Sequence, residues 1–143
     1  MTPPLPSALR EFVRLFNEEE FWECHEVLEG PWREHRSPFY HGLILYASAF
    51  VHLQRKNPHG VRAQLEKALK RLDPLPEAYL GVDLAALRRE ARRIRGKVPA
   101  PDAAGSSTWT DRIAFPILTL DPGRIRGDEV ELSYPKESGS SWD

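Results

Sequence analysis

Apolar residues recur every three or four positions along most of the first 97 residues, which is the spacing of one face of an α-helix. This pattern predicts five helices, at residues 7–17, 18–34, 37–56, 61–72 and 83–96. No alternation of apolar and polar residues typical of a strand occurs before residue 97. The predicted fold class is therefore all-α, a compact bundle of about five helices with an irregular C-terminal extension.

Residues that start, stop or interrupt helices set the expected boundaries. Ser7 is expected to cap the first helix, and Ser37 followed by Pro38 is a typical start for the third. Pro31 lacks a backbone N–H, so a kink or break is expected near Gly30 and Pro31 within the second helix. Residues 57–60 are expected to form a turn before the fourth helix.

The third helix is the expected centre of the bundle. It is apolar on nearly every side, as a helix surrounded by other helices should be. One of its stripes consists of His41, Leu45, Ser48 and His52, at intervals of about one turn. All of these residues except Leu45 are polar.

The composition changes after residue 97. We expect residues 1–97 to form a helical domain, and residues 98–143 to form a Pro-rich linker and an acidic tail that is partly extended or disordered. The apolar run at 115–120 could add one extended segment against the helices, whereas 138–143 is expected to be disordered.

Composition and charge narrow the class of protein. The 143 residues are 41% hydrophobic and 29% charged, which is ordinary for a globular chain. No apolar run reaches the roughly 18 residues of a membrane span, and the N-terminus lacks the basic and apolar blocks of a signal peptide. The single cysteine, Cys24, excludes an intramolecular disulfide framework. These features predict a cytoplasmic protein without a membrane partner.

The stretch Phe-Trp-Glu-Cys-His-Glu-Val-Leu-Glu-Gly-Pro-Trp at residues 21–32 carries the strongest chemical signal. His25 and Glu29 lie one helical turn apart on a face that also holds Trp22 and Trp32, and Glu26 flanks it. The next helix should run antiparallel, which would bring His25 level with Ser48 and near His52. The candidate pocket therefore comprises Trp22, His25, Glu26, Glu29, Trp32, Ser48 and His52.

This motif resembles a small bacterial and archaeal helical family, domain-of-unknown-function family 309. The resemblance rests on the stretch 21–32, on Phe16 and Asn17 before it, and on Gly42 and Gly60 after it, and it covers about residues 10–72. It implies a compact all-α fold and brings no established activity.

Three interpretations of the polar cluster remain open. The first is a structural network, because a buried imidazole without a partner costs roughly 1–3 kcal/mol. The second is a divalent metal site using His25, Glu29 and His52, although the ligand number is marginal and no other cofactor is expected. The third is a ligand or peptide groove lined by aromatic residues, for which the lining set is Trp22, Trp32, Phe21, Tyr40 and Tyr46.

We therefore predict a non-catalytic binding or scaffold module for an unknown small molecule or protein, with a homodimer as one arrangement. The alternative is a metal-dependent, hydrolase-like enzyme. A second alternative is binding of nucleic acid or an acidic partner through the arginine-rich helix at 83–96. Nucleic acid is the less favoured partner, because no aromatic residues interleave with these arginines and the pI is about 6.5.

Overall fold

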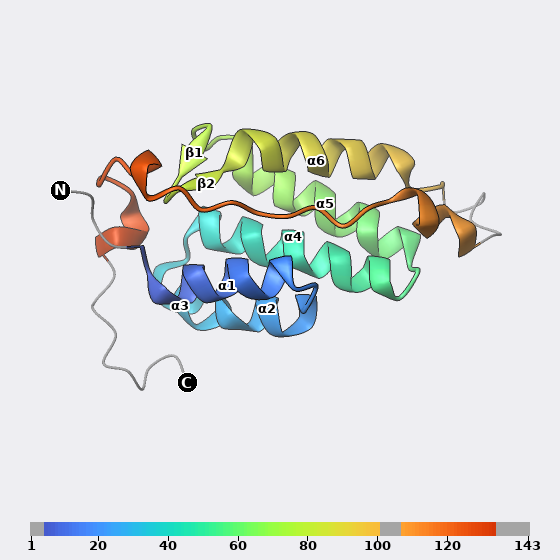
Figure 1. Ribbon diagram of the computed structural model, residues 1–143, viewed down its shortest axis with the longest axis horizontal. Helices are drawn as coiled ribbons and strands as arrows, with labels where there is room; N and C mark the ends of the chain where they lie inside the picture. Colours follow the sequence, from blue (N-terminus) through green and yellow to red (C-terminus); the bar gives the residue numbers. More distant parts are fainter. Residues whose placement is uncertain (1–4, 101–106, 134–143) are drawn as a thin grey trace.

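The structure of the protein is a computed structural model that describes residues 5–100 and 107–133. The expected all-α fold class is confirmed, with the second expected helix divided into two short ones. The helices are α1 (Ser7–Asn17), α2 (Phe21–Val27), α3 (Glu29–His35), α4 (Pro38–Gln54), α5 (Pro58–Leu72) and α6 (Leu84–Lys97). They run side by side along the long axis of the molecule (Figure 1). None of these helices combines the length and apolar character that a membrane crossing requires.

The break between α2 and α3 follows from Pro31. A helix that continued through this segment would need an N–H at Pro31 to bond the carbonyl of Val27, and proline has none. Helix α2 accordingly ends at Val27, and Leu28 joins it to α3, in whose first turn Pro31 lies without losing a bond. The break therefore falls slightly before the Gly30–Pro31 pair at which it was expected.

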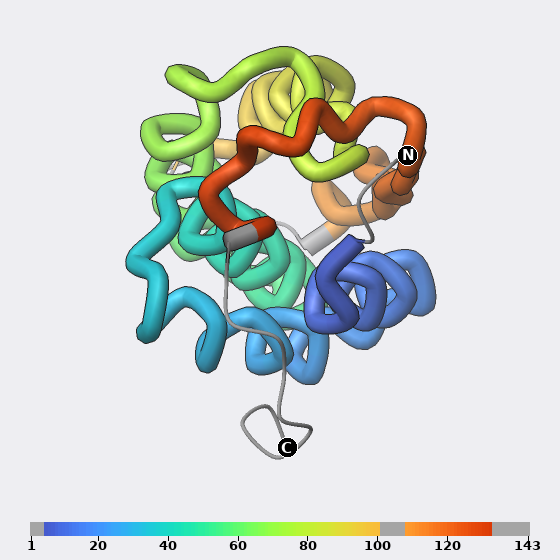
Figure 2. Tube along the Cα trace, turned by 90° about the vertical axis from the view of Figure 1, so that its left-hand side faces the viewer, coloured from blue at the N-terminus to red at the C-terminus, as the bar shows by residue number. Residues whose placement is uncertain are grey.

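Helix α4 is the centre of the bundle, as its all-round apolar character predicted. The Ser37 side chain caps it by accepting a hydrogen bond from the Tyr40 N–H at 3.2 Å. In the end-on view of Figure 2, α1 and α2 lie on one side of α4, with α5 and α6 on others. The longest helix is thus covered by its neighbours over most of its surface.

Two local predictions are corrected. Ser7 is the first helical residue of α1 rather than its cap, because Pro6 already has the extended backbone of a cap position. Residues 58–60 are the first turn of α5, since the Asn57 side chain caps that helix by accepting from the Gly60 N–H at 3.2 Å.

A short antiparallel hairpin was not expected. Strands β1 (Ala78–Tyr79) and β2 (Val82–Asp83) pair between α5 and α6. Leu80 and Gly81 form the two-residue turn, and both have the positive φ that a type I′ hairpin turn needs. With two residues in each strand, the hairpin is too short to leave an alternating pattern in the sequence.

Residues 113–121 cross the helices as an extended strap, which confirms that the apolar run at 115–120 packs against them (Figure 1). The Asn17 side chain holds the strap through both polar groups of Leu118: its amide donates to the Leu118 carbonyl at 2.8 Å and its oxygen accepts from the Leu118 N–H at 2.7 Å. Leu120 then forms an isolated bridge with Val82 of β2.

Three 3-10 helices flank the strap at residues 107–112, 122–124 and 130–133, labelled η2, η3 and η4. Trp109 and Ile113 are buried, so the described part of the C-terminal extension is attached to the bundle. The division at residue 97 into a domain and a linker with an acidic tail stays a prediction. Residues 138–143, the segment expected to be disordered, lie outside the described residues.

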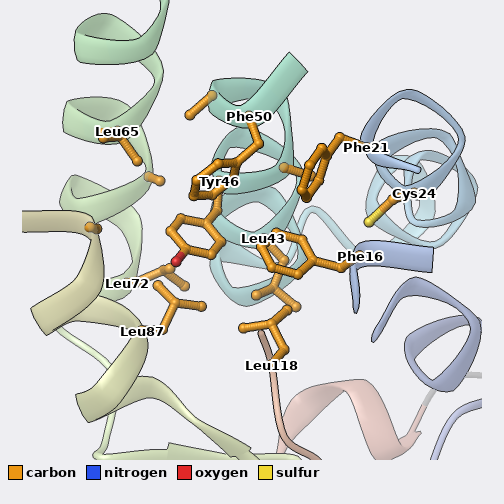
Figure 3. Packing of buried hydrophobic residues seen from close by; sticks show 14 of the residues in the cluster. Phe16, Phe21, Cys24, Leu43, Tyr46, Phe50, Leu65, Leu72, Leu87 and Leu118 are labelled. Atoms are coloured by element: carbon orange, nitrogen blue, oxygen red, sulfur yellow. The ribbon is translucent and has the colours of Figure 1, made fainter. Parts of the chain in front are cut away.

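Aromatic rings fill the middle of the core (Figure 3). Phe16 of α1 is fully buried, and its ring centre lies 5.1 Å from that of Phe21, 5.4 Å from Tyr46 and 5.5 Å from Phe50. Phe115 of the strap packs on the same group, 5.3 Å from Phe21. The strap therefore completes the core as well as crossing over it.

Glu131 in η4 and Glu129 just before it are both buried, and their pKa values shift in opposite directions. Burial raises the pKa of Glu131, which is 2% exposed and bonds to Ser37 and Tyr79. Burial also opposes ionisation of Glu129, but backbone N–H groups, including those of Arg126 and Gly127, lower its pKa overall.

This contrast predicts opposite pH dependences for Glu131→Gln and Glu129→Gln. The folded state holds the Glu131 proton more tightly than the unfolded chain, so wild-type stability falls as the pH rises above about 4.5, and Glu131→Gln removes this loss. Glu129 contributes stability above its unfolded pKa and loses it as the pH falls. Urea unfolding from about pH 4 to about pH 8 should therefore show Glu131→Gln gaining on wild type with rising pH while Glu129→Gln falls behind. Parallel curves for the two variants would contradict this assignment.

Candidate functional site

A partly exposed stripe of α4 carries the polar residues that the sequence singled out. Ser48 and His52 lie on it, together with His41 and Leu45, at intervals of about one helical turn. The rest of the helix is mostly buried. We use the name α4 face for this stripe together with side chains of α2, α3 and α5 and the residues that end α3 and α4. Its further members are Trp22, His25, Glu29, Trp32, Arg36, Arg55 and Arg71.

Trp22 marks one end of the α4 face. Its side chain is 51% exposed, although it is one of the largest apolar groups in the protein. The ring lies edge-on to the His25 imidazole at 4.8 Å, and the Arg55 guanidinium lies 5.9 Å from its centre. The contact with Arg55, at the end of α4, confirms the expected antiparallel course of α2 and α4.

His25 and Glu29 form the expected pair one turn apart. The His25 Nδ1 lies 2.5 Å from the Trp22 carbonyl, and its Nε2 lies 3.1 Å from Glu29 Oε1. The other carboxylate oxygen of Glu29 accepts from Arg33 at 2.8 Å. Because a carbonyl and a carboxylate are both acceptors, both contacts are hydrogen bonds only when the imidazole carries two protons. The pair lies within α2 and α3, and the His25 side chain is 15% exposed.

His52 does not face His25. Its Nδ1 lies 3.1 Å from the Asn57 side-chain amide, and Gly60 of α5 lies against its ring. Phe50, which contacts Phe21 of α2, precedes His52 by two residues, or about 200° around the helix. The side of α4 that meets α2 is therefore not the side that carries His52. The antiparallel course predicted how far along the helix axis His52 lies, but not the direction in which its side chain points.

The three residues predicted as metal ligands therefore do not come together. His25 and Glu29 are together and His52 is turned toward α5. Across residues 5–100 and 107–133, no group of three or more His, Cys, Asp or Glu side chains is arranged to hold a metal ion. Ser48 lies on the same stripe, while Glu26 is exposed on the outer side of α2.

The opposite end of the α4 face is built around Trp32 of α3. The Trp32 ring centre lies 4.5 Å from that of His41 and 4.6 Å from the Arg36 guanidinium. His41 in turn accepts a hydrogen bond at Nδ1 from Arg71 Nε of α5, at 2.7 Å. Three helices thus meet at this end, whereas α2 and α4 meet at the other.

Residues 9–64 match the family model "Domain of unknown function (DUF309)". Over this segment the chain is similar to the DUF309 family. No curated protein matches the chain. The resemblance inferred from the sequence is confirmed, and the matched DUF309 segment includes every member of the α4 face except Arg71.

The aromatic groove expected in the DUF309 segment is not formed by the whole predicted set. Phe21, Tyr40 and Tyr46 are buried in the core, and only Trp22 and Trp32 reach the surface. Burial raises the pKa of the Tyr46 hydroxyl well above its usual range. These three rings therefore stabilise the fold and do not line a binding surface.

Cys24 of the DUF309 segment is a packed core residue. Its side chain is fully buried and donates to the Phe12 carbonyl at 3.3 Å. Burial, followed by the nearby charge of Glu23, raises the pKa of the thiol. Both effects disfavour the thiolate that a nucleophile or a metal ligand requires.

The arginine-rich helix beyond the DUF309 segment is largely occupied by structural contacts. Arg88 donates to the carbonyls of Leu72 and Leu75, at 3.0 and 3.1 Å, at the end of α5 and just beyond it. Arg92 bonds both oxygens of Asp73 at 2.7 Å. The side chains that the nucleic-acid alternative would use most therefore hold the loop between α5 and β1.

Sequence reasoning missed three arginines of the α4 face: Arg36, Arg55 and Arg71. A signal existed for Arg36, which lies four residues after Trp32 and hence one turn further along the same side. Arg55 could have been placed beside Trp22 by counting along the antiparallel pair. Arg71 gave no local signal, because its partner His41 is 30 residues away.

Proposed function

We propose that the protein is a non-catalytic binding module whose contact surface is the α4 face. The observation that carries this proposal is the half-exposed Trp22 held between His25 and Arg55. Trp and Arg are the residues that most often dominate binding energy at protein interfaces. Trp is highly buried on average, so a ring exposed to this extent is a candidate anchor for a partner.

A protein segment fits the α4 face better than an enclosed small molecule. The face extends from His41 to Arg55 of α4, or about 21 Å at 1.5 Å per residue. Its apolar members lie between arginines at both ends, with Arg55 at one and Arg36 and Arg71 at the other. We therefore propose an acidic segment of another protein as the partner, in the cytoplasm.

The enzyme alternative has weaker support. It needs His25, Glu29 and His52 to converge, and the hydrogen bonds of His52 are to α5. Cys24, next to His25 in the chain, is buried, and its burial raises the pKa of the thiol and disfavours the thiolate of a nucleophile.

Selection of peptides from a random display library with the full chain tests the proposal. Selected peptides should be rich in Asp, Glu and apolar residues, and Trp22→Ala or Arg55→Ala should weaken their binding about tenfold or more, measured by fluorescence anisotropy. Two matched controls remove similar side chains elsewhere: Ile117→Ala, at a side chain 70% exposed on the strap, and Arg89→Ala on the exposed side of α6. Peptides that bind Trp22→Ala as tightly as wild type, or lose affinity equally with the controls, would count against this surface.

A further inference from the structure

One end of the α4 face concentrates positive charge around a neutral imidazole. Arg71 Nε donates to His41 Nδ1 at 2.7 Å, so this ring nitrogen accepts and carries no proton. The proton of the neutral ring therefore lies on Nε2, which remains a donor. Burial, and then the charges of Arg71 and Arg36, lower the pKa of His41 and favour this neutral form.

Arg36 approaches the same group from α3. Its guanidinium stacks over Trp32 at 4.6 Å, and Trp32 packs against His41 at 4.5 Å. Arg36 is also the C-terminal cap of α3, with a φ of 55° in the left-handed region. Three helices thus fix the positions of two guanidinium groups and one imidazole donor.

Arg36 and Arg71 form no ion pair with any carboxylate in the part of the chain that the structure describes. Other arginines of the protein do, as Arg33 does with Glu29 and Arg92 with Asp73. A guanidinium bonded to the imidazole, with a second one on the adjoining Trp32 ring and no carboxylate of the described residues paired with either, suits an anion.

We propose that Arg36, His41 and Arg71 bind the phosphate group of a small phosphorylated ligand beside Trp32. The guanidinium fork matches phosphate geometry, and two full positive charges match a dianionic phosphate monoester better than a singly charged carboxylate. The His41 Nε2–H supplies one more donor to a phosphate oxygen. This site goes beyond the proposed protein contact, because a small anion alone can occupy it.

Inorganic phosphate is the probe for this site. Titration of the full chain, followed by NMR of the His and Trp side chains at constant ionic strength, should shift the resonances of His41 and Trp32. Arg71→Gln and Arg36→Gly should each weaken phosphate binding about tenfold. Arg36→Gly also tests the site without disturbing the fold, because glycine adopts the positive φ of this position readily.

Two controls separate this site from other effects. Arg89→Gln removes an arginine charge from α6 and should leave phosphate affinity unchanged. Trp22→Ala, which removes the anchor of the proposed protein contact, should also leave it unchanged, so the two proposals fail separately. Three results would overturn the site: no shift at His41, acetate binding as tightly as phosphate, or wild-type affinity in both Arg36→Gly and Arg71→Gln.

Discussion

Replacement of Phe16 by alanine should lower the free energy of unfolding by about 3–5 kcal/mol. The Phe16 ring is fully buried and lies within 5.5 Å of the ring centres of Phe21, Tyr46 and Phe50. These rings come from two helices, α2 and α4, which are fixed by their other contacts, so they cannot all move to fill the space that the missing ring would leave. Both the lost burial and the resulting cavity therefore contribute.

Trp22→Ala is the matched control for Phe16→Ala. It removes a larger ring that is half exposed, so we expect a loss of about 1 kcal/mol or less. Urea unfolding followed by circular dichroism should show the two midpoints well separated. Similar midpoints would mean that Trp22 is a core residue, which would also remove the basis of the proposed binding surface.

Replacement of Gly42 by alanine should cost about 1–3 kcal/mol, although alanine is the better helix former. A Cβ atom at this position would lie 2.5 Å from Cγ and Cδ2 of Leu72, which is fully buried. Helices α4 and α5 approach each other so closely here that only glycine fits. Either the Leu72 side chain must leave its rotamer or the two helices must move apart.

Gly96→Ala supplies the control with the opposite sign. Gly96 lies in α6, and apart from the backbone of that helix and the two neighbouring residues, no atom of the described chain lies within 4 Å of the position that its Cβ would take. Alanine should therefore stabilise the protein here by up to about 1 kcal/mol. A loss of stability at both glycines would show that backbone effects, and not the contact with Leu72, determine the result at Gly42.

Much of the helical architecture could be predicted because it depends on local patterns. The period of apolar residues defines α1, α4 and α6, and Ser37 caps α4 as expected. The hairpin of β1 and β2 was missed because strands of two residues are too short to show a period. The attachment of the strap was visible only as an apolar run, since its contact with Asn17 spans 101 residues.

The candidate site was predictable to a similar extent. The His25–Glu29 pair and the position of Trp32 beside His41 follow from one-turn spacing and an antiparallel helix pair. The direction of the His52 side chain could not be predicted. A central helix has neighbours on several sides, and the periodicity of its residues does not say which neighbour each stripe contacts. The role of Arg88 was equally hidden, since the two carbonyls that it bonds lie 16 and 13 residues earlier in the chain.

The two hydrogen bonds between Asn17 and Leu118 of the strap bear on where a shortened chain could end. The family match stops at residue 64, in the middle of α5. Beyond it, Leu118 bonds to the amide of Asn17, and the ring of Phe115 packs on those of Phe21 and Phe50. A protein cut at the edge of the match would keep half of a helix and leave an aromatic surface open to water. The boundary drawn by sequence similarity therefore falls inside a helix, and residues well beyond it complete the packing of the matched segment.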